Sequence, residues 1–191
     1  MTRDQQQQLD DDRLRLPPEA GIERTPGRQT LTDGLIGPTE AAAQTRPRAD
    51  VAIAAARRGD VAQLGAWLDQ GGDPNAYDEE GWTPLLAAAV RGRAEAVALL
   101  LGRGANADAR HRVSGALPIH FAGHAASVPV AESLLAQRPD HLDAVWELNG
   151  HTLLLQAAFY ATPAHEDVAR FALARGANVT VTTVRGVAPL E

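Results

Sequence analysis

The segment LPIHFAGHAA, residues 117–126, carries His120 and His124 four positions apart. If the segment is helical, both imidazole rings lie on one face, because residues i and i+4 are neighbours on a helix surface. Neutral imidazole is a common ligand of zinc and iron, so the pair could hold a metal ion. The chemistry of this segment therefore depends on what else the fold brings beside it.

Glu147, His151 and Tyr160 could complete such a site if the fold places them beside His124. A constellation of histidines with a carboxylate is competent for catalysis on zinc or iron. In this interpretation the catalytic residues are His124, His151, Tyr160 and Glu147, and the metal ligands are His120 and His124. The protein would then be a small-molecule or metal-dependent enzyme.

The sequence lacks the compact motifs that usually accompany such chemistry. It has no HExxH motif, no carboxylate between the two histidines and no Ser-centred elbow. The segments GRGAN and ARGAN fit helix ends better than phosphate-binding loops. We therefore predict no catalytic residues, no metal and no cofactor, and we keep the enzyme as the alternative.

Composition narrows the class of protein and its partners. The 191 residues carry a net charge of −6, and all 18 basic residues are Arg. An acidic chain disfavours nucleic acid and anionic membranes as partners. The absence of Cys excludes disulfides and zinc–thiolate sites. Since no secretory signal or membrane-length apolar run is present, we expect a cytoplasmic protein.

Residues 1–49 differ in composition from the rest of the chain. They contain QQQQ, DDD and several Pro and Gly residues, with few apolar positions at regular spacing. This composition is typical of a flexible, mostly disordered arm, with one short ordered piece at TDGLIGPTEAAAQ. Two roles stay open: a docking or autoinhibitory arm, and a solvated leader, which we favour.

From Asp50 onward the sequence repeats itself. Gly81, Gly115, Gly150 and Gly186 open similar segments that lie 34, 35 and 36 residues apart. A period of this length is typical of stacked helical repeats. The earlier segment VAIAAARRGDVAQLGAWLDQGGDPNAYDEE has the same shape without the opening glycine.

Each repeat predicts two helices and a turn. Thr83 can cap a helix that Pro84 opens, since Pro is tolerated at the first helical position. A second helix follows the RGR turn, and Gly104 fits a left-handed helix stop. Neither helix buries its apolar side alone, so the units must stack.

The segments TPLL, LLLGRGANADA, LPIH and ARGANV resemble the ankyrin repeat over about residues 50–190. The resemblance implies an all-α fold, an ankyrin-type solenoid of stacked helix-turn-helix units with short hairpin loops. The units are expected at about 50–80, 81–114, 115–149 and 150–185, with a partial unit at 186–191. His120 falls on a structural histidine of the motif, expected to hydrogen-bond backbone between units.

Several departures from the pattern are informative. Arg138-Pro139 replaces the usual Gly-Ala and should reshape the end of unit 3. In unit 4, Leu153 replaces Pro, and YATPAHED looks like extra residues between the helices. Because a solenoid end exposes an apolar face, we expect downstream sequence to raise the melting temperature. A monomer is the expected state, and self-association through this uncapped end is the alternative.

The resemblance also implies a concave groove, built from hairpin tips and the exposed sides of the first helices. By position the partner-binding residues are Arg57, Arg58, Glu79, Glu80, Trp82, Val90, Arg91, His124, Trp146, His151, Phe159 and Tyr160. The same hairpin row holds Val113, Ser114, Ala116, Leu148 and Asn149. We predict a non-enzymatic module that binds another protein, with aromatic anchors and with arginines that pair with acidic groups. His111, His141 and His165 are expected in solvated loops.

Overall fold

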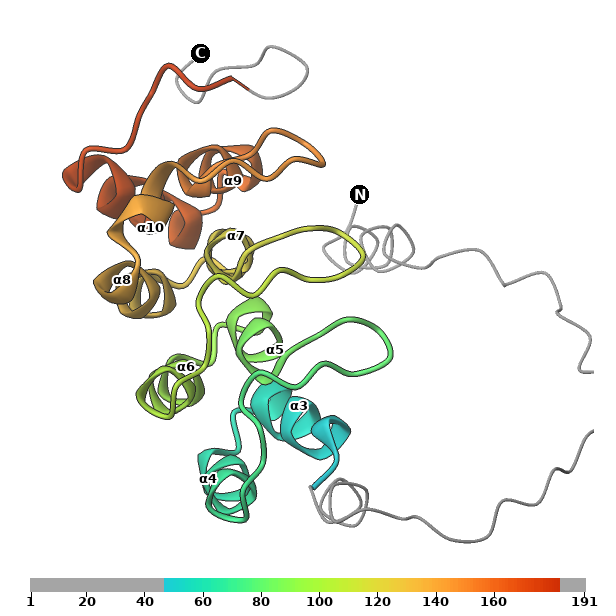
Figure 1. Ribbon diagram of the computed structural model, residues 1–191. Helices are drawn as coiled ribbons and strands as arrows, with labels where there is room; N and C mark the ends of the chain where they lie inside the picture. Colours follow the sequence, from blue (N-terminus) through green and yellow to red (C-terminus); the bar gives the residue numbers. More distant parts are fainter. Residues whose placement is uncertain (1–46, 183–191) are drawn as a thin grey trace, which may run out of the picture. The chain divides into compact units, whose positions relative to one another are not determined.

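The computed structural model describes residues 47–182, and Figure 1 shows them as a series of paired helices. The pairs are α3 (Ala49–Arg58) with α4 (Val61–Asp69), α5 (Pro84–Val90) with α6 (Ala94–Gly102), α7 (Pro118–His124) with α8 (Val128–Gln137), and α9 (Leu153–Tyr160) with α10 (Pro163–Ala174). A 3₁₀ helix, η1 (Pro139–Asp143), follows α8. The described residues form no strand, and Trp146 and His151 make an isolated antiparallel bridge. The all-α repeat fold is as predicted.

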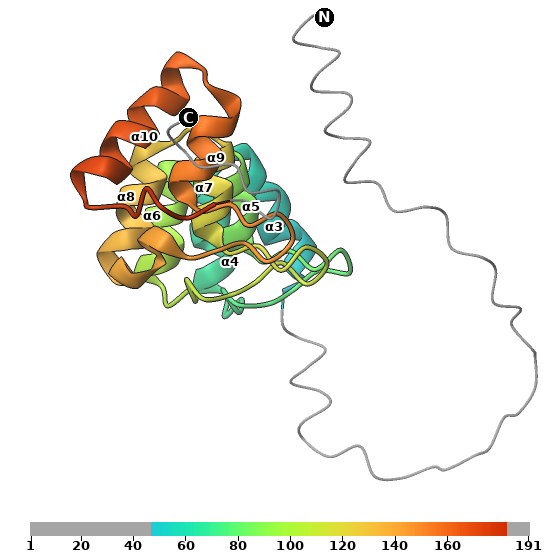
Figure 2. The same cartoon turned by 90° about the horizontal axis from the view of Figure 1, so that it is seen from above.

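The helices form two rows. In one row, called here the inner row, α3, α5, α7 and α9 contact each other in sequence; α4, α6, α8 and α10 form the outer row. The hairpin loops between units project to the same side of the inner row (Figure 1). Turned by 90°, the pairs follow one another as a stack (Figure 2). One buried cluster runs through all four pairs, so the units share a continuous core.

Small residues let the inner helices approach one another closely. Ala87, Ala88 and Ala89 of α5 are completely buried. In α7, a Cβ at Gly123 would lie 3.1 Å from the Gln156 side chain of α9. The low aromatic content of the chain therefore matches a core built on short helix–helix distances.

The predicted helix starts are confirmed. The Thr83 hydroxyl accepts a hydrogen bond from the backbone N–H of Leu86 at 3.3 Å, and Pro84 is the first helical residue. Thr152 caps α9 in the same way through Leu155, even though Leu153 replaces Pro. Local sequence thus fixes where the inner helices begin.

A left-handed residue ends each inner helix before the turn to the outer helix. Gly59 and Gly92 occupy this position in the first two units, with φ of 77° and 64°. Ala126 and Ala161 occupy it in the last two, with φ of 52° and 45°. A Cβ is disfavoured at such φ values, so the last two turns are strained relative to the first two.

Two predictions about the later units are resolved. The end of unit 3 is reshaped at Arg138-Pro139, where η1 begins directly after α8. The expectation of extra residues between the helices of unit 4 is wrong. The turn there consists of Ala161 and Thr162, and the remaining residues form the first turn of α10.

The prediction that three histidines are solvated is also wrong. His111, His141 and His165 are buried, with exposed fractions of 7%, 6% and 9%. His141 lies in η1, where its Nε2 is 2.9 Å from the Asp108 carboxylate. His165 lies in α10, and its Nδ1 is 2.7 Å from the Thr162 hydroxyl. Polar partners allow the His141 and His165 rings to be buried, whereas the Nε2 of His111 is buried without a hydrogen-bond partner among the described residues.

Predictions for residues 1–46 and 183–191 lie outside the described residues. They include the flexible arm, its short ordered piece and the partial fifth unit. Helix α3 begins at Ala49, close to the expected start of the repeats at residue 50.

Candidate partner-binding face

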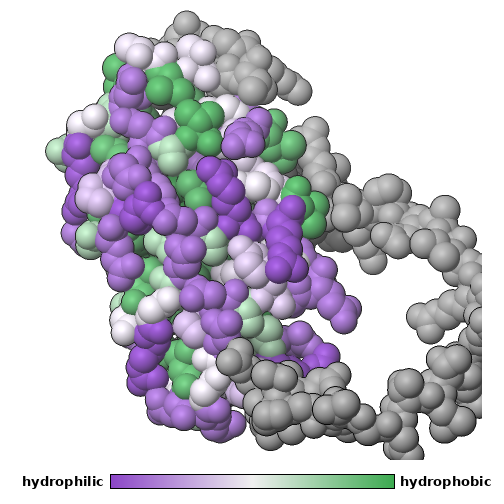
Figure 3. All heavy atoms as spheres, viewed as in Figure 1, coloured by the Kyte–Doolittle hydropathy of each residue, from purple (hydrophilic) through white to green (hydrophobic). Residues whose placement is uncertain are grey.

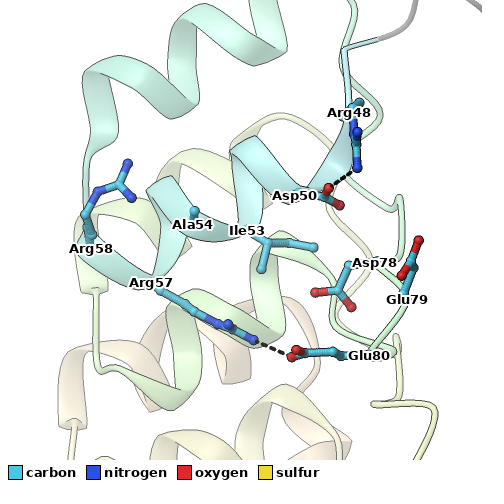
Figure 4. Close-up of a pocket in the computed structure, with 9 residues that line it drawn as sticks. All are labelled: Arg48, Asp50, Ile53, Ala54, Arg57, Arg58, Asp78, Glu79 and Glu80. Carbon is cyan, nitrogen blue, oxygen red and sulfur yellow. Dashed lines mark hydrogen bonds and ion pairs between the residues drawn. The ribbon is translucent and has the colours of Figure 1, made fainter.

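The candidate site is the inner face, defined as the exposed sides of α3, α5, α7 and α9 with the hairpin tips at residues 78–82, 110–116 and 145–151. At its first unit, charged side chains surround a shallow hollow over α3 (Figure 4). The Arg57 guanidinium is 3.5 Å from the Glu80 carboxylate and lies over the Trp82 ring at 5.3 Å. Buried Ile53 contributes to the lining. Arg57 thus already forms an ion pair with a carboxylate of its own chain.

The two tryptophans predicted as anchors are half-buried. The Trp82 ring packs against His111 at 4.2 Å and Phe121 at 5.2 Å. The Trp146 ring stacks on His120 at 5.9 Å, and its Nε1 donates a hydrogen bond to the Ser114 carbonyl at 2.6 Å. Both rings join neighbouring units, so their removal would disturb the array itself.

The most exposed large apolar side chains lie farther along the inner face. Val113 is 59% exposed, Leu148 is 68% exposed and Phe159 is 69% exposed. The contact between Trp146 and Ser114 joins the tips that carry Val113 and Leu148. The ring of His151, on the same tip as Leu148, lies 5.4 Å from that of Phe159. Val113, Leu148 and Phe159 are called the apolar row.

The apolar row stands out against the rest of the surface. In Figure 3, hydrophobic side chains occur as separate patches among hydrophilic ones. Of the seven large apolar residues exposed in the described part, four (Val113, Val145, Leu148 and Phe159) lie on two adjacent tips and at the end of α9. The repeat pattern identified Phe159, but it gave no measure of how far Val113 and Leu148 project.

The residues proposed for an enzyme active site do not converge on one point, because they form separate contacts. The Nδ1 of His124 is 2.8 Å from the Tyr160 hydroxyl, and the Tyr160 ring stacks on His165 at 4.9 Å. The Nδ1 of His151 instead faces the Gln156 amide oxygen at 2.7 Å. Residues 47–182 contain no group of three or more His, Asp or Glu side chains that could hold a metal ion.

The remaining two members of that set also have other contacts. Glu147 is 84% exposed at its side chain and lies 3.9 Å from Arg110. Both ring nitrogens of His120 bind backbone: Nδ1 accepts from the N–H of Leu117 at 3.1 Å, and Nε2 donates to the carbonyl of Ala144 at 2.8 Å. His120 therefore has no lone pair to offer a metal beside His124. It ties α7 to the segment after η1, within its own unit.

Burial controls the protonation of three histidines. It lowers the pKa of His120 from 6.5 to about 4, although the hydrogen bond to Ala144 opposes the shift. Burial also lowers the pKa of His165 and of His111. The three rings are therefore kept neutral at neutral pH, as structural groups within the stack.

The repeat geometry agrees with comparisons to known proteins. A model of three ankyrin repeats matches residues 52–143. The chain carries ankyrin repeats. The 2-5A-dependent ribonuclease of Mus musculus is 42% identical over 72 residues, which are 37% of this chain and 10% of that protein. The chain thus spans about a tenth of the length of this curated relative.

No helix within residues 47–182 has the length and apolar character needed to cross a membrane. Ankyrin repeats are, in general, modules for protein–protein interaction. The inner face is the part of this ankyrin array where exposed apolar side chains gather.

Proposed function

We propose that this protein is a non-enzymatic binding module whose inner face docks a partner protein through the apolar row. The observation that supports this most is the exposure of Leu148 and Phe159, each more than two-thirds exposed on adjoining elements. Burying a side chain of this size contributes about 1.5–3 kcal/mol, so leaving it in water is unfavourable unless a partner covers it.

The scaffold beneath the apolar row is preorganised. Thr152 caps α9 through Leu155, and Trp146 is fixed by its hydrogen bond to Ser114. His151 is held between Gln156 and the Phe159 ring. A rigid surface of this kind loses little conformational entropy when a partner binds.

The test compares proteins captured by the full-length chain with those captured by the double variant Leu148→Ser/Phe159→Ser. The matched control is Leu173→Ser, which changes a 39% exposed leucine on outer helix α10. Quantitative mass spectrometry should show proteins whose recovery falls about tenfold with the double variant, equivalent to about 1.4 kcal/mol, and stays unchanged with the control.

Thermal melting of the three proteins checks that the fold is kept. Substitutions at exposed positions should change stability by about 0.5 kcal/mol or less. Equal capture by the wild-type protein and the folded double variant would contradict binding through the apolar row.

A further inference from the structure

The arginines of the ankyrin array differ in whether they form an ion pair with a carboxylate. Seven arginines in residues 47–182 form ion pairs with carboxylates, namely Arg48, Arg57, Arg103, Arg110, Arg138, Arg170 and Arg175. Arg112 has no carboxylate in this part of the chain but lies over the Tyr77 ring at 4.1 Å. Arg58, Arg91 and Arg93 likewise form no ion pair with the described residues. These last three are called the turn arginines.

The turn arginines belong to two adjacent turns. Arg58 and Arg91 each directly precede the left-handed glycine at the end of an inner helix, Gly59 in unit 1 and Gly92 in unit 2. Helices α3 and α5 pack together, and packed helices lie about 8–10 Å apart. The two positions therefore repeat at a spacing comparable to the Debye length, about 8 Å in physiological salt.

Arg93 brings a third positive charge to the same place. A Cβ at Gly59 would lie 3.0 Å from the Arg93 side chain, and the Arg93 Nε donates a hydrogen bond to the carbonyl of Arg57 at 3.2 Å. The guanidinium of Arg93 thus reaches across from unit 2 to the end of α3. Arg58 donates to the amide of Gln63 at 2.6 Å, which leaves its charge unneutralised.

Stability alone does not account for this arrangement. Arg93 is the N-cap of α6, where an acceptor side chain would contribute about 1 kcal/mol and an arginine cannot accept. In the same position of unit 1, Asp60 caps α4 through the backbone N–H of Gln63. Asp60 and Glu95, the acidic residues beside these turns in sequence, form no ion pair with the turn arginines. The negative C-terminal ends of α3 and α5 offset part of these charges, but no carboxylate of the described residues forms an ion pair with any of the three arginines.

We infer that the turn arginines form a second contact zone, at the turns that follow α3 and α5, which receives an acidic segment of the partner protein. The inference rests on the proposed function and specifies the chemistry of the partner. Figure 4 shows why Arg58 belongs to this zone: Arg57 points toward Glu80, whereas Arg58 points away from the carboxylates of Asp78, Glu79 and Glu80. The sequence assigned Arg57, Arg58 and Arg91 to such contacts, and Arg57 differs from the other two because it forms an ion pair with Glu80.

A protein segment fits this zone better than nucleic acid. The turn arginines supply three charges, and Glu79 and Glu80 are exposed at the hairpin tip of the same units. A chain with a net charge of −6 repels an extended polyphosphate. A few carboxylates on a peptide, in contrast, match three guanidinium groups one to one.

The experiment selects short random peptides displayed on phage against the full-length protein. The variant is Arg58→Gln/Arg91→Gln/Arg93→Gln. The control is Arg103→Gln/Arg170→Gln/Arg175→Gln, which removes the same charge from arginines that lie in, or directly after, the outer helices α6 and α10. Peptides selected by the wild type and the control should be enriched about twofold or more in Asp and Glu. The enrichment should vanish with the variant, and the affinity of the best acidic peptide should fall about tenfold.

Each other outcome has a distinct meaning. Peptides that depend on Leu148 and Phe159 but show no acidic bias would overturn this inference while the proposed function stands. Selection of no peptide at all would count against the proposed function. A labelled single-stranded RNA that binds more tightly than the best acidic peptide would overturn the choice of a protein partner. A lower melting temperature with unchanged peptide selection would assign the turn arginines to the helix ends alone.

Discussion

Acidification should destabilise the ankyrin array, and His120 should contribute the largest single part of the loss. The neutral His120 ring accepts a hydrogen bond from Leu117 at Nδ1 and donates one to Ala144 at Nε2. Protonation would remove the Nδ1 acceptor and place a charge in a site that is 1% exposed. Burial, reinforced by the charges of Arg110, His141 and His151, holds the pKa of this ring at about 4, against 6.5 in the unfolded chain.

The sign of the effect follows from the direction of the shift. Because the folded-state pKa is lowered, the unfolded chain binds the proton first as the pH falls below 6.5. The full stability is therefore present above that value and is lost as the pH falls toward 4. The shift corresponds to about 3.4 kcal/mol in total, of which about 2 kcal/mol is lost between about pH 7 and about pH 5.

Urea unfolding of the full-length protein, followed by circular dichroism across this pH range, measures the loss. The comparison variant is His120→Gln, whose amide can accept from the Leu117 N–H but does not titrate. It should be less stable at neutral pH by about 1 kcal/mol through the lost bond to Ala144, with a pH dependence about 2 kcal/mol smaller. An equal pH dependence in the two proteins would refute the assignment to His120, since His111 and His165 titrate in both.

Five further substitutions test the backbone and the packing by urea unfolding at neutral pH. Gly92→Ala should lose about 1 kcal/mol, and Ala161→Gly at the equivalent left-handed position should gain about 0.5–1 kcal/mol; opposite signs would show that these turns are not strained by a Cβ. Gly81→Ala should lose about 2–4 kcal/mol, because φ is +84° and the new Cβ would lie 2.6 Å from that of Arg112. Gly102→Ala, with open space around it, should be neutral or stabilising. Trp82→Ala should lose about 2 kcal/mol through its contacts with neighbouring rings, and an unchanged midpoint would show that this ring is only a surface group.

The repeat architecture could be predicted because its signals are local. Thr83 followed by Pro84 marks a helix start within two residues, and Gly104 marks a helix end by its own φ of 83°. The start of α10 carried the same signal, since Thr162-Pro163 repeats the Thr-Pro pair, yet the extra length of YATPAHED obscured it. A local rule applied evenly to all four units would have placed this helix correctly.

Burial and pairing could not be predicted because they depend on contacts between units. The burial of His141 follows from Asp108, which lies in the preceding unit. The pairing of Arg57 with Glu80 depends on a side chain 23 residues away in sequence. Whether an arginine forms an ion pair therefore depends on contacts between stacked units, and the repeat period alone does not predict it.

The three tryptophans have a practical consequence. Each occupies a different part of the array: Trp67 is buried in α4 and donates to the carbonyl of Arg48 at 3.1 Å, Trp82 lies on the first hairpin tip, and Trp146 lies on the third. The last two rings pack against His111 and His120. The protein thus contains three intrinsic fluorescent probes, one in each of the first three units. Variants that keep one tryptophan at a time would show, without any added label, in which order these three units open.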